Sequence, residues 1–254
     1  MDLIEKASDN KRHPWELARF EVVKDILKNI VNDYEGKKVL DLGCGDLFFI
    51  EEFSKNKPNT NFFAVDIAFT DAYVHRPLTT EIHIANSLDQ WSEDQNFRLD
   101  IVFLMDVLEH IEEDLSFLKN LLAKKYITEK TIFVITVPAY QELFSTHDIF
   151  LKHYRRYSKR SLNTVVEEAG LVSMDRGFFF FSLLLPRALE VFKERYLKKN
   201  NTKGTGLTRW KYGHFVSITL KRFLIFDYQI HKLFKKIGLG TPGLSNYIIC
   251  KKPV

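Results

Sequence analysis

The segment Val39-Leu40-Asp41-Leu42-Gly43-Cys44-Gly45 joins a short apolar run to a glycine-bearing turn. The run has the length and composition of a strand that is buried on both faces of a parallel sheet. Glycine at positions 43 and 45 removes the side chains that would keep a ligand away from the backbone. We therefore expect a ligand to bind directly after this strand.

Short apolar runs and amphipathic helical patterns alternate over the first 140 residues. The predicted strands are Lys38–Leu42, Asn61–Asp66, Glu81–Ala85, Asp100–Leu104 and Thr131–Val137. The predicted helices include Leu17–Val31, Phe48–Lys55 and Leu115–Lys125. This alternation predicts a doubly wound α/β sheet with right-handed crossovers. Ligands of such sheets bind beyond the carboxyl ends of the strands.

The chain changes character after the fifth strand. Pro138–Tyr157 is an aromatic loop with His and Arg residues, and a helix is expected between Ser158 and Gly170. Two further strands are predicted at Leu171–Phe180 and Asn246–Lys251. The residues between these strands are mostly helical in pattern.

That helical part contains two apolar stripes. One comprises Leu185, Leu189, Phe192 and Tyr196, and the other comprises Val216, Leu220, Phe223, Ile230, Phe234 and Ile237. A polar connector, Asn200–Gly206, separates them. The run Gly177–Pro186 is too short to span a bilayer, which needs ~20 apolar residues. It either lies in a membrane interface beside the basic residues that follow, or packs on the sheet.

The charges are distributed unevenly. Residues 1–151 contain 16 Lys or Arg against 27 Asp or Glu, whereas residues 152–254 contain 21 against 6. The basic half indicates either an anionic partner or solvated lysines on exposed helices. Met1–Asn10 has no signal-peptide pattern, and Cys44 and Cys250 suggest no disulfide framework, so we expect a cytoplasmic protein.

The glycine turn is compatible with more than one nucleotide. A dinucleotide fingerprint would place a third glycine at position 48, which is Phe48 here. Asp66 ends the next strand, where a carboxylate can accept hydrogen bonds from two ribose hydroxyls. Asp66 alone does not separate NAD from other nucleosides.

The later segments indicate a family. Asp100-Ile-Val-Phe-Leu-Met-Asp-Val-Leu-Glu-His-Ile111 resembles the fourth strand and following turn of class I S-adenosylmethionine (SAM)-dependent methyltransferases, especially the ubiquinone-biosynthesis-like branch. Val137-Pro138-Ala139, Ser145-x-His147-Asp148 and His153-x-Arg155-Arg156-Tyr157 resemble a subset of uncharacterised bacterial members. The resemblance covers roughly residues 13–175 and the final strand.

This resemblance implies a Rossmann-like sheet of seven strands, mostly parallel with an antiparallel last strand. It implies SAM as the cofactor and S-adenosylhomocysteine (SAH) as the product. The family pattern has an acidic residue two positions before the first glycine, here Asp41, and a third glycine where this chain has Leu47. The implied cofactor-binding residues are Asp41, Gly43, Cys44, Gly45, Asp66, Ile67, Asn86, Ser87, Met105 and Asp106.

We expect residues 1–254 to form one domain. Within it, residues 1–35 are expected to form a helical cap, whose Arg19 either faces the carboxylate of the cofactor or caps the surface. Residues 181–243 are expected to form a helical insertion beside the active site, as a lid or a substrate-recognition element.

The catalytic candidates lie in the loops after the strands. Methyl transfer needs alignment and exclusion of water, and a hydroxyl acceptor benefits from a base. His147 is the first candidate for that base, with Asp148 orienting it or binding substrate, and His110 is the second candidate or a structural residue. The residues expected to bind substrate are His153, Arg155, Arg156 and Tyr157. Arg155 and Arg156 either clamp a phosphate or carboxylate of the substrate or hold the loop to acidic neighbours.

The acceptor itself is not encoded in these motifs. The aromatic insertion and its basic residues favour O-methylation of a small, lipid-linked or anionic molecule, with a peripheral membrane surface as a further partner. One alternative is an RNA methyltransferase, although no RNA-binding module is present. Another is a non-catalytic, membrane-docking nucleoside-binding protein. No Cys/His cluster has metal-ligand spacing, so we expect no metal.

Overall fold

A seven-stranded mixed sheet forms the centre of the molecule. The computed structural model describes residues 12–70, 73, 81–91, 96–196 and 212–253. The strand order is β3-β2-β1-β4-β5-β7-β6. The strands are β1 (Lys38–Leu42), β2 (Asn61–Val65), β3 (Ile82–Ala85), β4 (Leu99–Met105), β5 (Ile127–Pro138), β6 (Val172–Phe179) and β7 (Ser245–Lys251).

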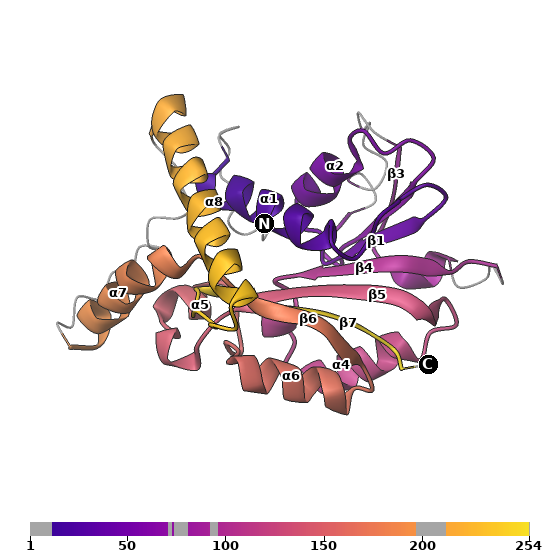
Figure 1. Ribbon diagram of the computed structural model, residues 1–254. Coiled ribbons are helices and arrows are strands. Elements are labelled where there is room, and N and C mark those ends of the chain that lie inside the picture. The colour runs from indigo at the N-terminus through magenta and orange to yellow at the C-terminus, as the bar shows by residue number, and fades with distance from the viewer. Residues whose placement is uncertain (1–11, 71–72, 74–80, 92–95, 197–211, 254) are drawn as a thin grey trace.

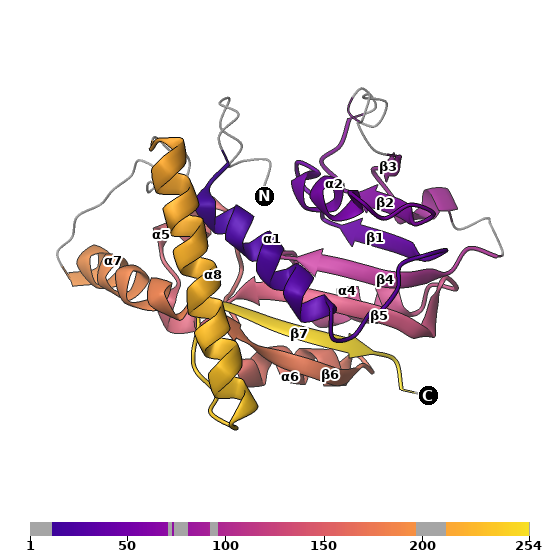
Figure 2. The same ribbon diagram turned by 45° about the horizontal axis from the view of Figure 1, so that its top comes forward.

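The strand directions confirm the predicted Rossmann-like fold. Strands β1 to β5 pair in parallel, whereas β7 is antiparallel to both β5 and β6. Strand β6 therefore runs in the same direction as the first five strands. In Figure 2 the arrowheads of β1, β4 and β5 point toward the side of the molecule where α1, α5, α7 and α8 gather.

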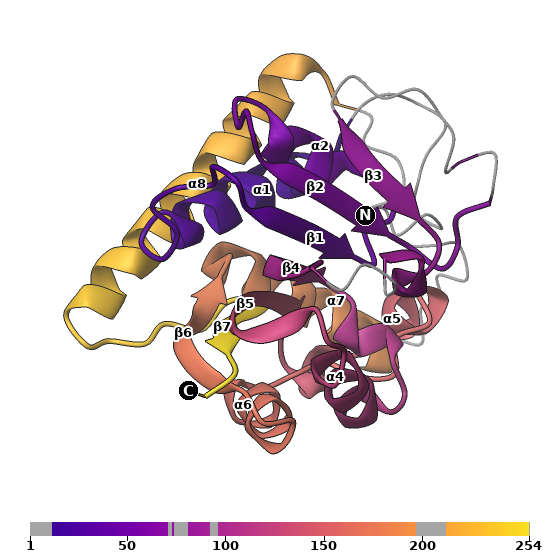
Figure 3. The same ribbon diagram turned by 90° about the vertical axis from the view of Figure 1, so that its right-hand side faces the viewer.

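The helices cover both faces of this sheet. They are α1 (Pro14–Leu27), α2 (Phe48–Ser54), α4 (Asp114–Leu122), α5 (Thr146–Phe150), α6 (Lys159–Glu168), α7 (Leu184–Tyr196) and α8 (His214–Lys236). One apolar core contains residues of α1, α2 and α8, and the other contains residues of α4 and α6. Figure 3 shows the sheet between these two helical layers. Both faces of the parallel strands are thus buried, as their continuous apolar runs predict.

The segment after β5 is more regular than a plain loop. It contains the 3₁₀ turn η3 (Gln141–Leu143) and the short helix α5, which Ser145 caps by accepting a hydrogen bond from the backbone N–H of His147. Helix α6 begins after the predicted cap Ser158 and ends just before Gly170, whose φ of +96° suits glycine.

The apolar run Gly177–Pro186 divides into two parts. Phe178, Phe179 and Phe180 are buried, and Phe179 and Phe180 belong to the core beneath α1 and α8. Phe181 and Leu185 are exposed. The aromatic half of the run therefore packs on the sheet, and only its end reaches the surface.

The two predicted apolar stripes lie mostly on the surface. On α7, Leu185, Leu189, Phe192 and Tyr196 are exposed, whereas Arg187 and Val191 face inward. On α8, Leu224 and Tyr228 are buried, while Val216, Phe223, Ile230, Phe234 and Ile237 are exposed. The predicted connector Asn200–Gly206 lies outside the described residues. No described helix is both long enough and apolar enough to cross a membrane.

Leu47 takes the backbone conformation that a glycine would adopt. It has a φ of +68° just before α2, and its side chain is fully buried. A left-handed leucine costs roughly 1–2 kcal/mol, which burial of the side chain offsets. The departure from the family pattern at position 47 therefore preserves the path of the loop.

Candidate active site

The glycine loop lies between the carboxyl ends of β1 and β2. The N–H of Gly43 donates to the carbonyl of Val65 at 2.7 Å, and the N–H of Gly45 donates to Oδ2 of Asp66 at 2.8 Å. Gly43 has a φ of +76°, and a Cβ there would lie 2.6 Å from Cγ2 of Val107. Both the backbone conformation and this close approach require glycine. Cys44 between them is buried.

Asp41 brings an unsatisfied carboxylate to this loop. Its side chain is buried, and neither carboxylate oxygen has a hydrogen-bond partner within the described part of the chain. Burial raises the pKa of Asp41 to about 7, against the opposing charge of Arg19. A buried acceptor without a donor is costly, so this position suits a ligand that donates a hydrogen bond.

Asp66 is held at its carboxylate by backbone N–H groups on both sides, one of which is that of Gly45 in the glycine loop. Its Oδ1 accepts a hydrogen bond from the N–H of Ala68 at 2.9 Å, and its own N–H donates to the carbonyl of Ala85 in the next strand. Each carboxylate oxygen retains a lone pair for a further donor. Ile67 and, at the end of β3, Asn86 and Ser87 are exposed beside it.

The end of β4 contacts the first helix. Asp106, with a φ of +57°, follows the buried Met105 and forms an ion pair with Arg19 of α1. Oδ1 of Asp106 also accepts a hydrogen bond from Thr136 at 3.0 Å, and Arg19 stacks on Trp15. Arg19 is only 6% exposed, so it does not cap the surface. It links the N-terminal helix to the carboxyl edge of the sheet.

A second contact ties the N-terminal segment to the glycine loop. Arg12 forms an ion pair with Asp46 at 2.6 Å and stacks on the ring of Phe48. His13 and Glu16 form a capping box at the start of α1. The residues before and within α1 therefore lie against the loop and the end of β4.

The carboxylate of Asp148 is the centre of a buried hydrogen-bond network. Oδ1 accepts from Nε of Arg156 at 2.8 Å and faces Nδ1 of His153 at 3.0 Å. Oδ2 accepts from the N–H of Ser145 and, at 2.8 Å, from Arg187 of α7. Burial alone would raise the pKa of Asp148, but the bonds from His153 and Arg156 hold it well below its usual range. Both oxygens of Asp148 are thus occupied by protein donors.

His147 lies in the first turn of α5, beside this network. Its side chain is 7% exposed. Burial and the charge of Arg187 lower the pKa of His147, so its imidazole is neutral at neutral pH. The neutral imidazole of His147 can therefore accept a proton.

Arg155 and Tyr157 attach the loop to the start of α4. Arg155 forms an ion pair with Asp114 at 3.1 Å, and the hydroxyl of Tyr157 donates to the same carboxylate at 2.5 Å. Tyr157 is buried, and burial raises its pKa above the usual range. Arg155 and Arg156 hold the loop to acidic neighbours, which is one of the two roles predicted for them, and Tyr157 makes a contact of the same kind. Arg155 is the most exposed of the three.

The structure also assembles residues that lie far apart in the sequence. Glu109 and His110, in the 3₁₀ turn η2 (Leu108–His110), meet His153, and one ligand atom from each lies within 4.8 Å of the others. Glu109 is fully buried, and burial raises its pKa to about 8. In the sequence Glu109 belongs to the segment that resembles the methyltransferase family, and that motif does not predict its burial.

Arg187 is the second residue that sequence reasoning missed. It directly follows the apolar run Gly177–Pro186, yet it is 8% exposed and bound to Asp148, Ser145 and Glu190. An arginine in the first half of a helix gives no local sign of such a partner 39 residues away.

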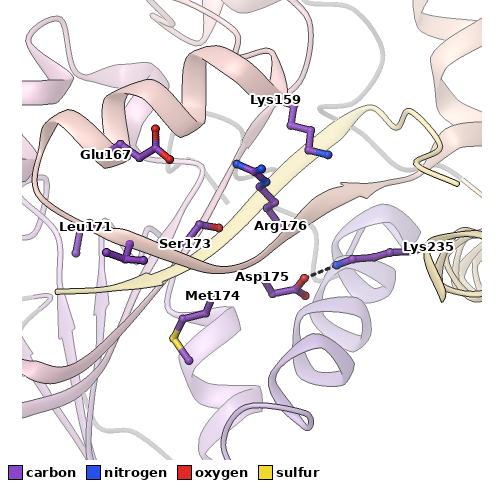
Figure 4. Close-up of a pocket in the computed structure, with 9 residues that line it drawn as sticks. Lys159, Glu167, Leu171, Ser173, Met174, Asp175, Arg176 and Lys235 are labelled. Atoms are coloured by element: carbon purple, nitrogen blue, oxygen red, sulfur yellow. Dashed lines mark hydrogen bonds and ion pairs between the residues drawn. The ribbon is translucent and has the colours of Figure 1, made fainter. Parts of the chain in front are cut away.

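A surface hollow lies away from this edge of the sheet. Its lining includes Leu171, Met174 and Arg176, and the ion pair of Asp175 with Lys235 crosses one side of it (Figure 4). These residues come from the first half of β6 and from the helices beside it. Because β6 runs parallel to β1, the hollow is not at the carboxyl edge where the glycine loop lies.

The comparisons with known proteins agree with this arrangement. The sequence profile of the methyltransferase domain family matches residues 15–174, which is more than half of the chain. The chain belongs to the methyltransferase domain family. Together with the seven-stranded sheet, this membership makes it a class I SAM-dependent methyltransferase. A search of the curated proteins finds no match.

Solved structures share the fold of this methyltransferase at low identity. The plantazolicin methyltransferase BpumL, in complex with SAH and a monoazolic analogue, matches with a TM-score of 0.54 and 11% identity over 95% of this chain and 85% of that one. The [4+2]-cyclase SpnF matches with a TM-score of 0.54 and 14% identity over 97% and 86%. A sarcosine dimethylglycine methyltransferase from Galdieria sulphuraria matches with a TM-score of 0.54 and 15% identity over 93% and 86%.

The residues of this methyltransferase fit the cofactor that its family implies. The unpartnered carboxylate of Asp41 and the open lone pairs of Asp66 offer acceptors at one edge of the sheet, on either side of the glycine loop. An ammonium group and ribose hydroxyls are donors of the matching kind. The hydrogen-bond donors of the cofactor therefore match the acceptors of the site.

Replacing Asp148 with Asn should destabilise the methyltransferase by about 3–5 kcal/mol, because the buried Arg156 would lose its ion-pair partner and Arg187 would keep only that of the partly exposed Glu190. Urea unfolding at pH 7 measures this change. The matched control is Glu142→Gln on the exposed turn η3, which should alter stability by less than about 0.5 kcal/mol. Equal stabilities of the two variants would show that Asp148 does not hold α5 and α7 together.

Proposed function

We propose that this methyltransferase transfers a methyl group from SAM to an oxygen of a small amphiphilic, anionic acceptor. The observation that best supports an oxygen acceptor is a buried, neutral His147 in the segment that follows β5. The exposed apolar stripes of α7 and α8 support an amphiphilic one. SAM supplies an electrophilic methyl group, and the protein supplies alignment and exclusion of water.

The cofactor would be held by the residues at the carboxyl edge of β1 to β4. Asp41 would accept hydrogen bonds from its amino group, and Asp66 would accept them from the ribose hydroxyls. Gly43, Cys44 and Gly45 would present backbone to it. The adenine would lie near Ile67, Asn86 and Ser87, and the methionine end would lie near Met105 and Asp106, under the ion pair with Arg19.

Calorimetry tests this arrangement. SAH should bind to the wild type and NADH should not bind comparably, because the third glycine of a dinucleotide loop is absent. Asp66→Ala should weaken SAH binding by at least about 10-fold, since each hydrogen bond to a charged group contributes about 1.5–3 kcal/mol.

The matched control is Glu81→Ala, an exposed carboxylate just before β3 that should leave SAH affinity unchanged. Equal affinity of the wild type for SAH and NADH would contradict the assignment of the cofactor site.

His147 would accept the proton of the acceptor hydroxyl. A base must be unprotonated before it acts, and the lowered pKa of His147 satisfies that condition at neutral pH. Asp148 does not share the proton, because its two oxygens are occupied by Arg156, Arg187, His153 and Ser145. Its role would be to hold α5, and with it His147, in place.

His147→Ala should reduce methyl transfer by about 10²- to 10⁴-fold while SAH affinity stays within twofold. The measurement is transfer of tritium from methyl-labelled SAM into a total lipid extract. His83→Ala, an exposed histidine on β3, serves as the control. Full transfer by a folded His147→Ala variant would exclude His147 as the base.

The apolar surface of α7 and α8 would receive the hydrophobic part of the acceptor at a membrane. Large exposed side chains include Leu189 and Phe192 on α7 and Phe223, Phe226 and Leu233 on α8. On α8, Phe223, Phe226 and Leu233 recur at helical spacing, and an exposed apolar helix face of this kind marks interaction sites. In Figures 1 and 2 both helices stand at the side of the molecule toward which the central strands point.

The charges beside this surface favour an anionic membrane. Arg222 and Lys236 on α8 and Lys193 on α7 are exposed cations next to apolar residues. An apolar face bordered by cations can lie in the headgroup region of a bilayer.

Vesicle flotation tests this surface. Wild-type protein should float with vesicles that contain anionic phosphatidylglycerol, and a variant with Phe223, Phe226, Ile230 and Leu233 changed to Ser should not. The control variant carries Val172→Thr and Met174→Gln, two exposed apolar residues on β6. Identical flotation of the two variants would dismiss the membrane surface.

The contacts of the basic half weaken the RNA alternative. Arg155, Arg156 and Arg187 bind carboxylates of the loop segment and of α4, and Lys221, Lys232 and Lys235 bind carboxylates of α1 and β6. Six of the 21 basic residues of this half therefore already pair with carboxylates of the protein. The non-catalytic alternative predicts SAH binding without transfer of label from SAM to any extract.

A further inference from the structure

Glu109, His110 and His153 form a cluster outside the glycine loop. The first two lie in η2, after β4, and the third lies after α5. One ligand atom from each residue lies within 4.8 Å of the other two. The rings of His110 and His153 meet edge to face, with centroids 4.5 Å apart. Two imidazoles and one carboxylate thus converge from two separate segments.

Glu109 is the most unusual member of this cluster. Its side chain is fully buried, and neither of its carboxylate oxygens has a hydrogen-bond partner among the described residues. Its backbone carbonyl accepts a hydrogen bond from Tyr154 at 2.7 Å, which ties η2 to the segment with His153. A buried carboxylate without donors is costly, and a bound cation would remove that cost.

His153 is oriented as metal-binding histidines are. Its Nδ1 lies 3.0 Å from Oδ1 of Asp148, which is itself fixed by Arg156 and Arg187. This contact commits Nδ1 to the carboxylate and leaves Nε2 as the ligand atom. A carboxylate behind the imidazole fixes the ring and strengthens it as a ligand.

We propose that Glu109, His110 and His153 bind a divalent transition-metal ion of the zinc type. Two histidines and one glutamate form a known class of catalytic zinc site, with ligand distances of about 2.0–2.2 Å. The three ligand atoms already lie within 4.8 Å of one another. Only a small inward movement of the side chains would bring all three to ligand distance of a single ion. The imidazoles disfavour magnesium and calcium, which prefer oxygen ligands.

The position of this site deepens the proposed function, on which this step rests. Glu109 lies three residues after Asp106 in the sequence. The methionine end of the cofactor is expected near Asp106. Three protein ligands leave a coordination position for water or for a substrate oxygen. An acceptor hydroxyl bound there would lose its proton more readily, and His147 would be the base that receives it.

Isothermal titration of the metal-stripped full-length protein with Zn²⁺ tests the site. We expect one ion per chain, and at least 10-fold weaker binding in Glu109→Gln and in His153→Ala. His214→Ala, an exposed histidine at the start of α8, should bind as the wild type does. Cobalt absorption spectra should show a bound Co²⁺ in the wild type that both site variants lack.

Thermal unfolding keeps the test independent of activity. A free ion at ~100 times its dissociation constant should raise the Tm of the wild type by roughly 5–10 °C and leave that of Glu109→Gln unchanged. Equal Zn²⁺ binding by wild type and Glu109→Gln, or no stoichiometric binding by the wild type, would overturn the proposal.

SAH titrations in parallel separate this proposal from the one before it. Retained SAH binding without Zn²⁺ binding overturns the metal site alone. Zn²⁺ binding without SAH binding overturns the proposed function and supports the metal site. All variants should keep the wild-type circular dichroism spectrum, and His153→Asn replaces His153→Ala if the latter fails to fold.

Discussion

The active-site edge of this methyltransferase depends on a single buried carboxylate. Asp148 joins α5 to the following loop through Arg156 and His153, and to the helical insertion through Arg187 of α7. Two arginines can be buried together only if a negative charge lies between them. The placement of His147, of His153 and of α7 relative to the sheet therefore follows from one electrostatic requirement. An ion pair on the surface would contribute far less to the free energy of unfolding.

The same edge also contains two carboxyl groups to which no described protein group donates a hydrogen bond. Asp41, at the glycine loop, and Glu109, after β4, are both buried without hydrogen-bond partners in the described part of the chain, and burial raises the pKa of each. Parallel strands bring their carboxyl ends to one edge, so such groups gather where ligands bind. Asp41 therefore suits an ammonium group, and Glu109 belongs to the metal site that we propose.

The sheet could be predicted from the sequence because its strands are short, apolar and separated by amphipathic helices. Lys38–Leu42 was predicted with its observed bounds, and the antiparallel last strand followed from the family resemblance. Other bounds shifted: β5 begins four residues earlier than predicted, and α1 runs from Pro14 to Leu27. Propensity patterns do not locate ends, which depend on caps such as His13 and on pairing with neighbouring strands.

The sequence by itself determined the alternation of strands and helices and the glycine loop, because each depends on patterns within a few residues, and the family resemblance implied the cofactor class. Tertiary structure alone decided that Arg187 is buried against Asp148, that the apolar stripes of α7 and α8 face outward, and that Glu109 and His110 meet His153. The expectation of no metal rested on spacing along the chain. Ligands from segments more than forty residues apart have no characteristic spacing, and only the packing of η2 against the loop after α5 brings them together.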